Sequence, residues 1–209
     1  MKIKRANPRY PIHNLSKKRW SPRAFNGEPV ETEKLQRIFE AARWSPSASN
    51  EQPWAFIVGM QGDETYDKIF STLVEFNQLW VKTAPLLAIS AGRSISLKNG
   101  MPAEYFKYDV GQAMAHLTFQ ATYEGLYVHQ MAGFDREKAH QLLEIPEKYE
   151  VISAFTIGYP GDYKMLHKNL QAMEIAPRER LHTDDFVFSG TFGHAAEWIT
   201  REQKETSPK

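Results

Sequence analysis

The stretch TEKLQRIFEAARWSPSASNEQPWAFIVGM, residues 32–60, contains a complete helix-to-strand unit. Its first part has apolar residues at the spacing of one helix face: Leu35, Ile38, Phe39 and Ala42. Thr32 can cap this helix, and Pro46 disfavours a helical residue before it, so the helix should end near Trp44. The apolar run 54–60 then has the length of a buried strand. The unit predicts a helix that packs on a sheet.

The same alternation continues along the chain. The patterns predict further helices at 64–82, 103–124 and 135–143, and further strands at 84–91, 126–131 and 151–157. Helices that alternate with at least four strands predict a sheet covered by helices, in one domain spanning residues 1–209. Residues 1–12 are expected to form an N-terminal arm. The region from about 163 to 209 is irregular and polar, so we expect an extension that packs on another surface, such as a partner subunit.

Composition excludes several kinds of chemistry. The chain has 209 residues and no cysteine, which excludes disulfide frameworks, thiolate nucleophiles and cysteine-zinc sites. Any redox chemistry must therefore come from a cofactor. No apolar run is long enough to span a membrane, and the N-terminus lacks the apolar core of a secretory signal, so we expect a cytoplasmic protein without a membrane partner.

Positive charge is concentrated at the N-terminus. Residues 1–23 contain eight Lys or Arg and no acidic residue, whereas the remaining residues carry a net charge of −7. Such a run is typical of a solvated arm, and it is also compatible with capture of a small phosphate group. No basic stripe interleaved with aromatic residues occurs elsewhere, so a nucleic-acid partner is not expected.

Several common catalytic signatures are absent from the sequence. The seven histidines show no HExxH or comparable ligand spacing, so no metal site is expected. The chain also lacks a GxSxG nucleophile turn, a phosphate-binding P-loop and a GxGxxG dinucleotide turn. Hydrolase, P-loop and Rossmann interpretations thereby lose their main support, although an acid-base pair assembled in space remains open.

Three short polar segments suit an anionic planar ligand. Arg19, Ser21 and Arg23 point the same way in an extended chain and offer donors suited to a phosphate. The segment 46–54 joins the first helix to the first strand through small hydroxyls and carboxamides. Arg178 and Arg180 add two bases late in the chain.

The chain resembles the nitroreductase family of FMN-dependent oxidoreductases. Four motifs carry the resemblance, in the family's order and spacing across about residues 13–195: RWSPRAF (19–25), AARWSPSASNEQPW (41–54), MAGFD (131–135) and IGYPGD (157–162). The resemblance implies an α+β fold with a central, mostly antiparallel sheet covered by helices. It also implies a homodimer with exchanged tails, in which FMN lies at the subunit interface.

The resemblance also implies which residues bind FMN. Arg19 and Ser21, with Trp20 between them, match the phosphate and ribityl end, and Arg23 the flavin pyrimidine. The resemblance implies that four residues of the loop between the first helix and the first strand come from the other subunit: Ser47, Ala48, Asn50 and Gln52. Gln130, Met131 and Gly133 match positions beside flavin N5. Asn77 matches a position beside the flavin pyrimidine, and Arg178 and Arg180 match basic residues at the phosphate. Gln130 stands where the family commonly has Pro, and Trp80 where some members have Lys.

The implied activity is hydride transfer from NADH or NADPH through FMN N5 to nitroaromatic, quinone or similar planar acceptors, by a ping-pong mechanism. No protein side chain is expected to act as a catalytic acid, base or nucleophile, because the isoalloxazine carries the hydride. An FMN-dependent oxidase, dehydrogenase or dehalogenating reductase acting on one metabolite is an alternative, as is a non-enzymatic flavin-binding protein. The sequence does not decide between NADH and NADPH.

Overall fold

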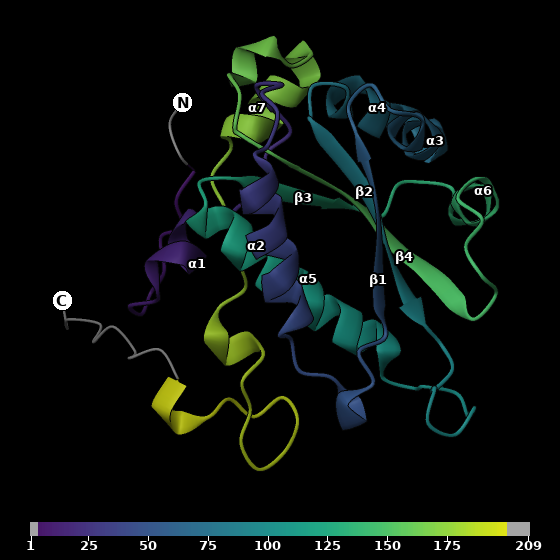
Figure 1. Cartoon of the computed structure of the whole chain (residues 1–209). Helices are drawn as coiled ribbons and strands as arrows, with labels where there is room; N and C mark the ends of the chain where they lie inside the picture. The colour runs from purple at the N-terminus through teal and green to yellow at the C-terminus, as the bar shows by residue number, and fades with distance from the viewer. Residues whose placement is uncertain (1–3, 200–209) are drawn as a thin grey trace. The chain divides into compact units, whose positions relative to one another are not determined.

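A four-stranded antiparallel sheet forms the centre of the first of two units into which the chain divides, the boundary falling between Ala176 and Pro177. The structure, a computed structural model, describes residues 4–199. The sheet has the strand order β1-β2-β4-β3, and its strands are β1 (Trp54–Met60), β2 (Leu86–Arg93), β3 (Tyr127–Met131) and β4 (Tyr149–Gly158). Figure 1 shows helices on both faces of this sheet, which confirms the expected α+β fold with an antiparallel sheet.

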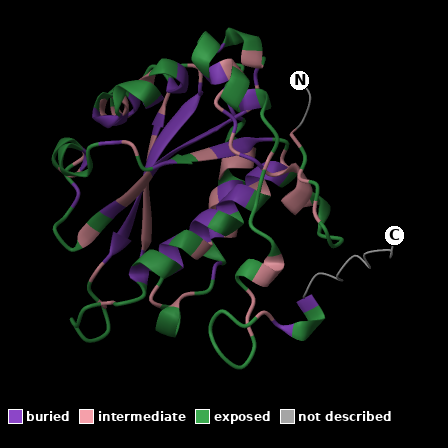
Figure 2. Cartoon of the chain, turned by 180° about the vertical axis from the view of Figure 1, so that it is seen from behind, coloured by how far each residue is buried: buried purple, intermediate pink, exposed green. Residues whose placement is uncertain are grey.

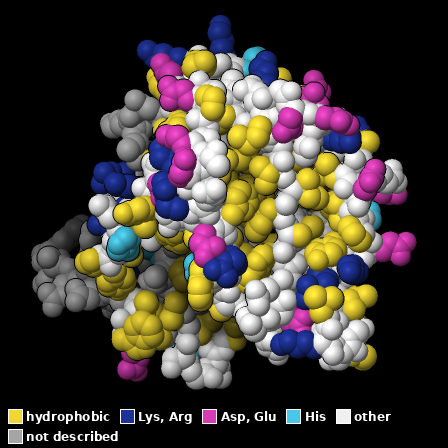
Figure 3. All heavy atoms as spheres, in the orientation of Figure 1, with side chains coloured by type: hydrophobic (Ala, Val, Ile, Leu, Met, Phe, Trp, Pro, Cys, Tyr) yellow, Lys and Arg dark blue, Asp and Glu magenta, His cyan; other side chains and the backbone are white. Residues whose placement is uncertain are grey.

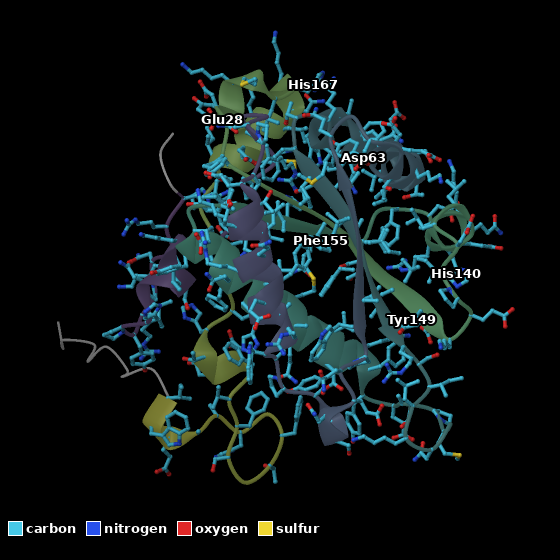
Figure 4. All side chains as sticks on the ribbon, in the orientation of Figure 1. Glu28, Asp63, His140, Tyr149, Phe155 and His167 are labelled. Carbon is cyan, nitrogen blue, oxygen red and sulfur yellow. The ribbon has the colours of Figure 1, made fainter. Side chains whose placement is uncertain are left out.

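Each face of the sheet carries its own hydrophobic cluster. One is formed under α2 (Thr32–Arg43) and α5 (Phe106–Tyr123), the other under α3 (Glu64–Thr72), α4 (Glu75–Val81), α6 (Arg136–Leu142) and α7 (Lys168–Ile175). Phe155, labelled in Figure 4, belongs to the first cluster, where its ring lies edge-on to Phe56 at 6.1 Å. Strand β2 is buried along its whole length, as Figure 2 shows by its colour, because both neighbouring strands and both helical layers cover it.

The edge strand β1 is much less covered than β2. All of its residues except Gly59 are only half-buried, and Figure 3 shows hydrophobic side chains gathered over this part of the molecule. An edge strand with apolar side chains at its surface is a ready template for pairing with another chain.

The strand register defines two ends of the sheet. At one end Met60 pairs with Leu86, which in turn pairs with Ile157. At the other end Trp54 pairs with Gly92, and the start of β4 at Tyr149 lies beside the end of β2. Figure 4 shows the same arrangement, with Asp63, just beyond β1, at the opposite end from Tyr149.

The helix predicted at 64–82 is wrong as a single element, because α3 ends at Thr72 and α4 begins at Glu75. Leu73 adopts an extended conformation between them and bridges to Phe134. This tertiary pairing overrides a helical pattern that contains no Pro or Gly.

Two further helices lie where none was expected. α1 (Asn14–Lys18) directly follows the N-terminal arm, and α7 lies within the region expected to be irregular from residue 163. The remaining elements predicted from the sequence lie within a few residues of the observed ones, and the first helix has Glu31 rather than Thr32 at its N-cap.

The second unit contains little regular structure in its described part, residues 177–199. It has two short 3-10 helices, η3 (Thr183–Asp185) and η4 (Glu197–Ile199), and one bridge between Phe188 and Ala195. Among residues 4–199, no helix is both long and apolar enough to cross a membrane.

Candidate functional site

The segment after α1 brings Arg19 and Ser21 together. Arg19 caps α1 by donating its backbone N–H to Leu15 O at 2.8 Å, and its Nη1 lies 3.4 Å from Ser21 Oγ. Trp20 points the other way and is buried, edge-on to Tyr127 with ring centroids 6.1 Å apart. Alternation along an extended chain therefore leaves two donors together on one side and an anchoring ring on the other.

Arg23 is held by a buried carboxylate from α7. The backbone N–H groups of Arg23 and Ala24 both donate to Glu174 Oε1, at 2.8 and 3.2 Å. The guanidinium of Arg23 lies over the ring of Phe76, 6.0 Å from its centroid, and its Nη1 is 3.9 Å from Glu174 Oε2. Nothing in the sequence pattern singled out Glu174, which is one glutamate on a short helix.

A second contact joins α4 to the turn after β3. Asn77 is buried, and its Nδ2 donates to Gly133 O at 2.9 Å, beside a bond of 3.1 Å from Val74 N to the same oxygen. A Cβ placed on Gly133 would lie 2.9 Å from Asn77 Nδ2 and 2.9 Å from Val74 Cγ2. Gly133 thus permits the close approach of the turn to α4, while its implied place beside flavin N5 stays a prediction.

The other two predicted residues of this turn lie on β3 and face opposite sides. Gln130 is exposed, whereas Met131 is buried in the cluster under α3 and α4. The side chain of Met131 therefore belongs to the core, and only its main chain is left to face a ligand.

His129, which the sequence analysis did not single out, connects the two segments. Its Nδ1 lies 2.8 Å from Pro22 O, and its ring packs on Trp80 with centroids 4.5 Å apart. Burial, with a smaller contribution from the positive charge of Arg23, lowers the pKa of His129 to about 4. The ring is therefore neutral at pH 7, and with a proton on Nδ1 it donates to Pro22 O. His129 thus fixes the main chain directly before Arg23.

The loop 47–52 has an unusual backbone. Three non-glycine residues, Ser49, Asn50 and Gln52, have positive φ angles of 51°, 56° and 48°. The loop is held from within, since Ser47 Oγ accepts the backbone N–H of Gln52 at 3.0 Å, and from α5, since Asp109 Oδ2 accepts the backbone N–H of Ala48 at 3.1 Å. Backbone strain that surrounding hydrogen bonds hold in place is found most often at the functional sites of proteins.

A buried ion pair stabilises the same loop from β2. Arg93 Nη2 donates to Glu51 O at 2.8 Å and to Glu51 Oε2 at 3.0 Å, and Ser96 Oγ donates to Glu51 Oε1 at 2.6 Å. The bond from Ser96, together with Arg93, lowers the pKa of Glu51. Sequence reasoning missed Arg93 because its partner is 42 residues away.

Within one chain, the loop 47–52 and the segment 19–25 lie at opposite ends of the sheet. The loop precedes Trp54 at one end of β1, whereas Phe25 bridges to Pro160, just beyond the end of β4, which is at the same end of the sheet as Met60. At about 3.3 Å per residue, the length of β1 separates the two ends by about 20 Å. One chain therefore does not bring these two predicted parts of the site together.

Arg178 and Arg180 belong to the second unit. Burial, and then the charge of Arg180, lower the pKa of Arg178, while Arg180 Nη1 donates to Glu179 O at 2.6 Å. Their predicted role at a phosphate stays a prediction. In residues 4–199, no cluster of His, Asp and Glu has the form of a metal site.

Comparison with known proteins assigns the family. The model described as "Nitroreductase family" matches residues 16–75 and 60–159. The chain belongs to the nitroreductase family. Its similarity extends to the crystal structure of an oxidoreductase containing FMN, which is 34% identical, with a TM-score of 0.85 over 90% of this chain and 96% of that one.

Other nitroreductase relatives are more distant. A protein of Archaeoglobus fulgidus named "Putative NADH dehydrogenase/NAD(P)H nitroreductase" is 29% identical over 150 residues, which are 70% of this chain and 83% of that protein. A nitroreductase family protein of Streptococcus pneumoniae shares the fold, with 21% identity and a TM-score of 0.69 over 84% of this chain and 98% of that one. In this nitroreductase-family chain, the segments 19–23, 76–77 and 129–133 form one connected group.

Proposed function

We propose that this protein is an FMN-dependent oxidoreductase that uses NADH or NADPH. The observation that carries the proposal is that Arg23, Asn77 and Gly133 lie in one connected group. Arg23 lies over the ring of Phe76, and Asn77 donates to Gly133 O. His129 joins the two parts by its contacts with Pro22 O and the Trp80 ring. Support also comes from the FMN-containing relative that aligns over 90% of the chain, and from the NAD(P)H nitroreductase name of the archaeal relative.

The residues present fit the chemistry of FMN. The phosphate needs charge-assisted donors, which Arg19 supplies beside the hydroxyl of Ser21. Arg23 Nε is buried and has no hydrogen-bond partner among the described residues, so it retains a donor for a ligand. Gly133 lets the turn after β3 pack closely against the Asn77 and Val74 side chains, which holds the main chain of the turn in place.

Each residue has a distinct role in this proposal. Arg19 and Ser21 hold the phosphate and ribityl end, and Arg23 holds the pyrimidine side of the ring. A fixed cation there stabilises negative charge on the reduced ring more than it stabilises the oxidised ring. Asn77 fixes the turn at Gly133, whose main chain, with those of Gln130 and Met131, faces the ring.

A homodimer completes the site. The loop 47–52 lies about 20 Å from the segment 19–25 of its own chain, so a loop of a second subunit would supply Ser47, Ala48, Asn50 and Gln52. The uncovered apolar edge at β1 supports an association with a second copy. The proposal includes Arg178 and Arg180 at the phosphate.

Bound FMN would supply the hydride chemistry, which in this proposal is ping-pong hydride transfer from NAD(P)H to a nitroaromatic, quinone or similar planar acceptor. The protein's own contribution is to bind, orient and set the electrostatics of the ring. No described side chain has to move a proton in this scheme.

The test starts with the purified protein. It should be yellow, release FMN on denaturation, and lose its flavin absorbance band under anaerobic conditions when NADH or NADPH is added. Colourless protein that cannot be reconstituted with FMN would refute the proposal. Bound FMN that neither nicotinamide bleaches would instead favour an oxidase, a dehydrogenase or a flavin-binding protein without this activity.

The dimer has its own test. An Arg19→Ala variant and an Ala48→Asp variant each damage a different part of the site. After unfolding and refolding together, mixed dimers contain one intact site, so part of the FMN-binding capacity should return. A mixture that binds no more FMN than the separate variants would exclude a shared site.

A further inference from the structure

Glu174 is a buried acid that has no assigned role in the proposed reaction. It lies on α7 and is 3% exposed, and α7 follows the last strand of the sheet. Acidic side chains are almost never buried to this extent unless they are paired. The partners of Glu174 should therefore indicate what it does.

The first carboxylate oxygen holds the backbone on both sides of the Arg23 carbonyl. Glu174 Oε1 accepts two hydrogen bonds, from Arg23 N at 2.8 Å and from Ala24 N at 3.2 Å. Their sequence separations are 151 and 150 residues, so this contact exists only in the folded chain. A carboxylate that accepts two main-chain N–H groups fixes the direction in which the Arg23 side chain leaves the backbone.

The second oxygen acts on the charge of Arg23. Glu174 Oε2 is buried and makes no hydrogen bond to any described residue, and it lies 3.9 Å from Arg23 Nη1. The Arg23 side chain is itself only 20% exposed, so water screens this pair poorly. The carboxylate therefore attracts the guanidinium and offsets part of its positive charge.

We propose that Glu174 is a positioning residue that fixes Arg23 and, by offsetting its charge, lowers the reduction potential of the bound flavin. This rests on the proposed function, because it needs FMN at Arg23. Reduction adds negative charge to the ring, so a weaker local positive charge stabilises the reduced ring less. The phosphate is present in every variant that is compared, so its effect on the potential is the same in each.

The experiment compares two substitutions of Glu174 in the FMN-loaded protein. Glu174→Gln keeps an oxygen that can accept both main-chain N–H groups but removes the charge. We expect the ratio of affinities for reduced and oxidised FMN to rise about three- to tenfold, where a tenfold change corresponds to about 30 mV for a two-electron couple. Glu174→Ala removes the acceptor as well, so FMN should also dissociate more readily.

A matched control removes the same unit of charge elsewhere. Glu64 is exposed on α3 and pairs with Lys68, so Glu64→Gln changes the net charge without touching Arg23. Its potential should equal that of the unsubstituted protein. An equal shift in both variants would overturn the inference, because net charge alone would then account for it.

A second variant covers the case in which Glu174→Gln does not fold. Arg23→Gln removes the group through which Glu174 acts, and it should lower the potential of the bound FMN. An unchanged potential in Arg23→Gln, or in a folded Glu174→Gln protein, would overturn the role of Glu174. Either result would come from a yellow protein, whereas failure of the proposed function would show as protein that binds no FMN.

Discussion

Replacement of Gly133 by Ala tests the contact between α4 and the turn after β3. The added Cβ would lie 2.9 Å from Asn77 Nδ2 and 2.9 Å from Val74 Cγ2, well inside the usual 3.5–4.0 Å separation of non-bonded carbon atoms. Both contacts are with the ends of side chains, so the collision would displace the Asn77 amide and the Val74 methyl group rather than the main chain.

The size of the effect follows from two losses. Forcing an extra carbon into a packed site costs about 1–3 kcal/mol. Displacing Asn77 also breaks its 2.9 Å bond to Gly133 O, and leaving buried polar groups unpaired costs about 1–3 kcal/mol. Because relaxation relieves the collision partly by breaking this bond, we expect a total loss of about 2–4 kcal/mol in the free energy of unfolding.

Urea denaturation followed by circular dichroism, with and without saturating FMN, measures this loss. The control is a double-mutant cycle with Asn77→Ala, which removes the amide that the new Cβ meets. Gly133→Ala should cost less in the Asn77→Ala background than alone. Strictly additive effects of the two substitutions, or a Gly133→Ala protein as stable as the original, would refute the argument from close approach.

Three further predictions concern other parts of the molecule. Arg19→Ala should weaken FMN binding by about 1.5–3 kcal/mol, the loss of a charge-assisted hydrogen bond, and a fluorescence titration that finds unchanged affinity would count against Arg19 as a phosphate ligand. His129 binds a proton more readily in the unfolded chain, where its pKa is 6.5, than in the fold, where it is about 4. The free energy of unfolding should therefore fall by up to about 3 kcal/mol as the pH drops through this range; His129→Gln should lack this part of the pH dependence, and an identical pH profile would exclude His129 as its source. Gly161→Ala should cost more than about 3 kcal/mol, because its Cβ would lie 2.6 Å from the main-chain oxygen of Phe25, which cannot move aside as a side chain can; a thermal melt within a few degrees of the original would contradict this.

Local patterns were enough to predict most of the regular structure. The apolar run at 54–60 forms β1 with the predicted bounds, because its length and flanking residues leave few other conformations. The helix at 64–82 was predicted as one element because nothing in its sequence marks a break, yet the bridge from Leu73 to Phe134 divides it. α7 was missed because its apolar residues do not have the spacing of one helix face, and the residue buried beside Leu170 is the acidic Glu174.

The sequence by itself determined the family motifs, the need for a cofactor and the donors at Arg19, Ser21 and Arg23. These depend on residue types and short spacings, which the chain carries whether or not it is folded. Only the tertiary structure decided that Glu174 and His129 hold the segment around Arg23, and that the loop 47–52 lies at the other end of the sheet. The physical reason is that the contacts of Glu174 and His129 join residues more than a hundred positions apart, and the place of the loop depends on which strand ends lie side by side. Neither of these can be read from a short stretch of sequence.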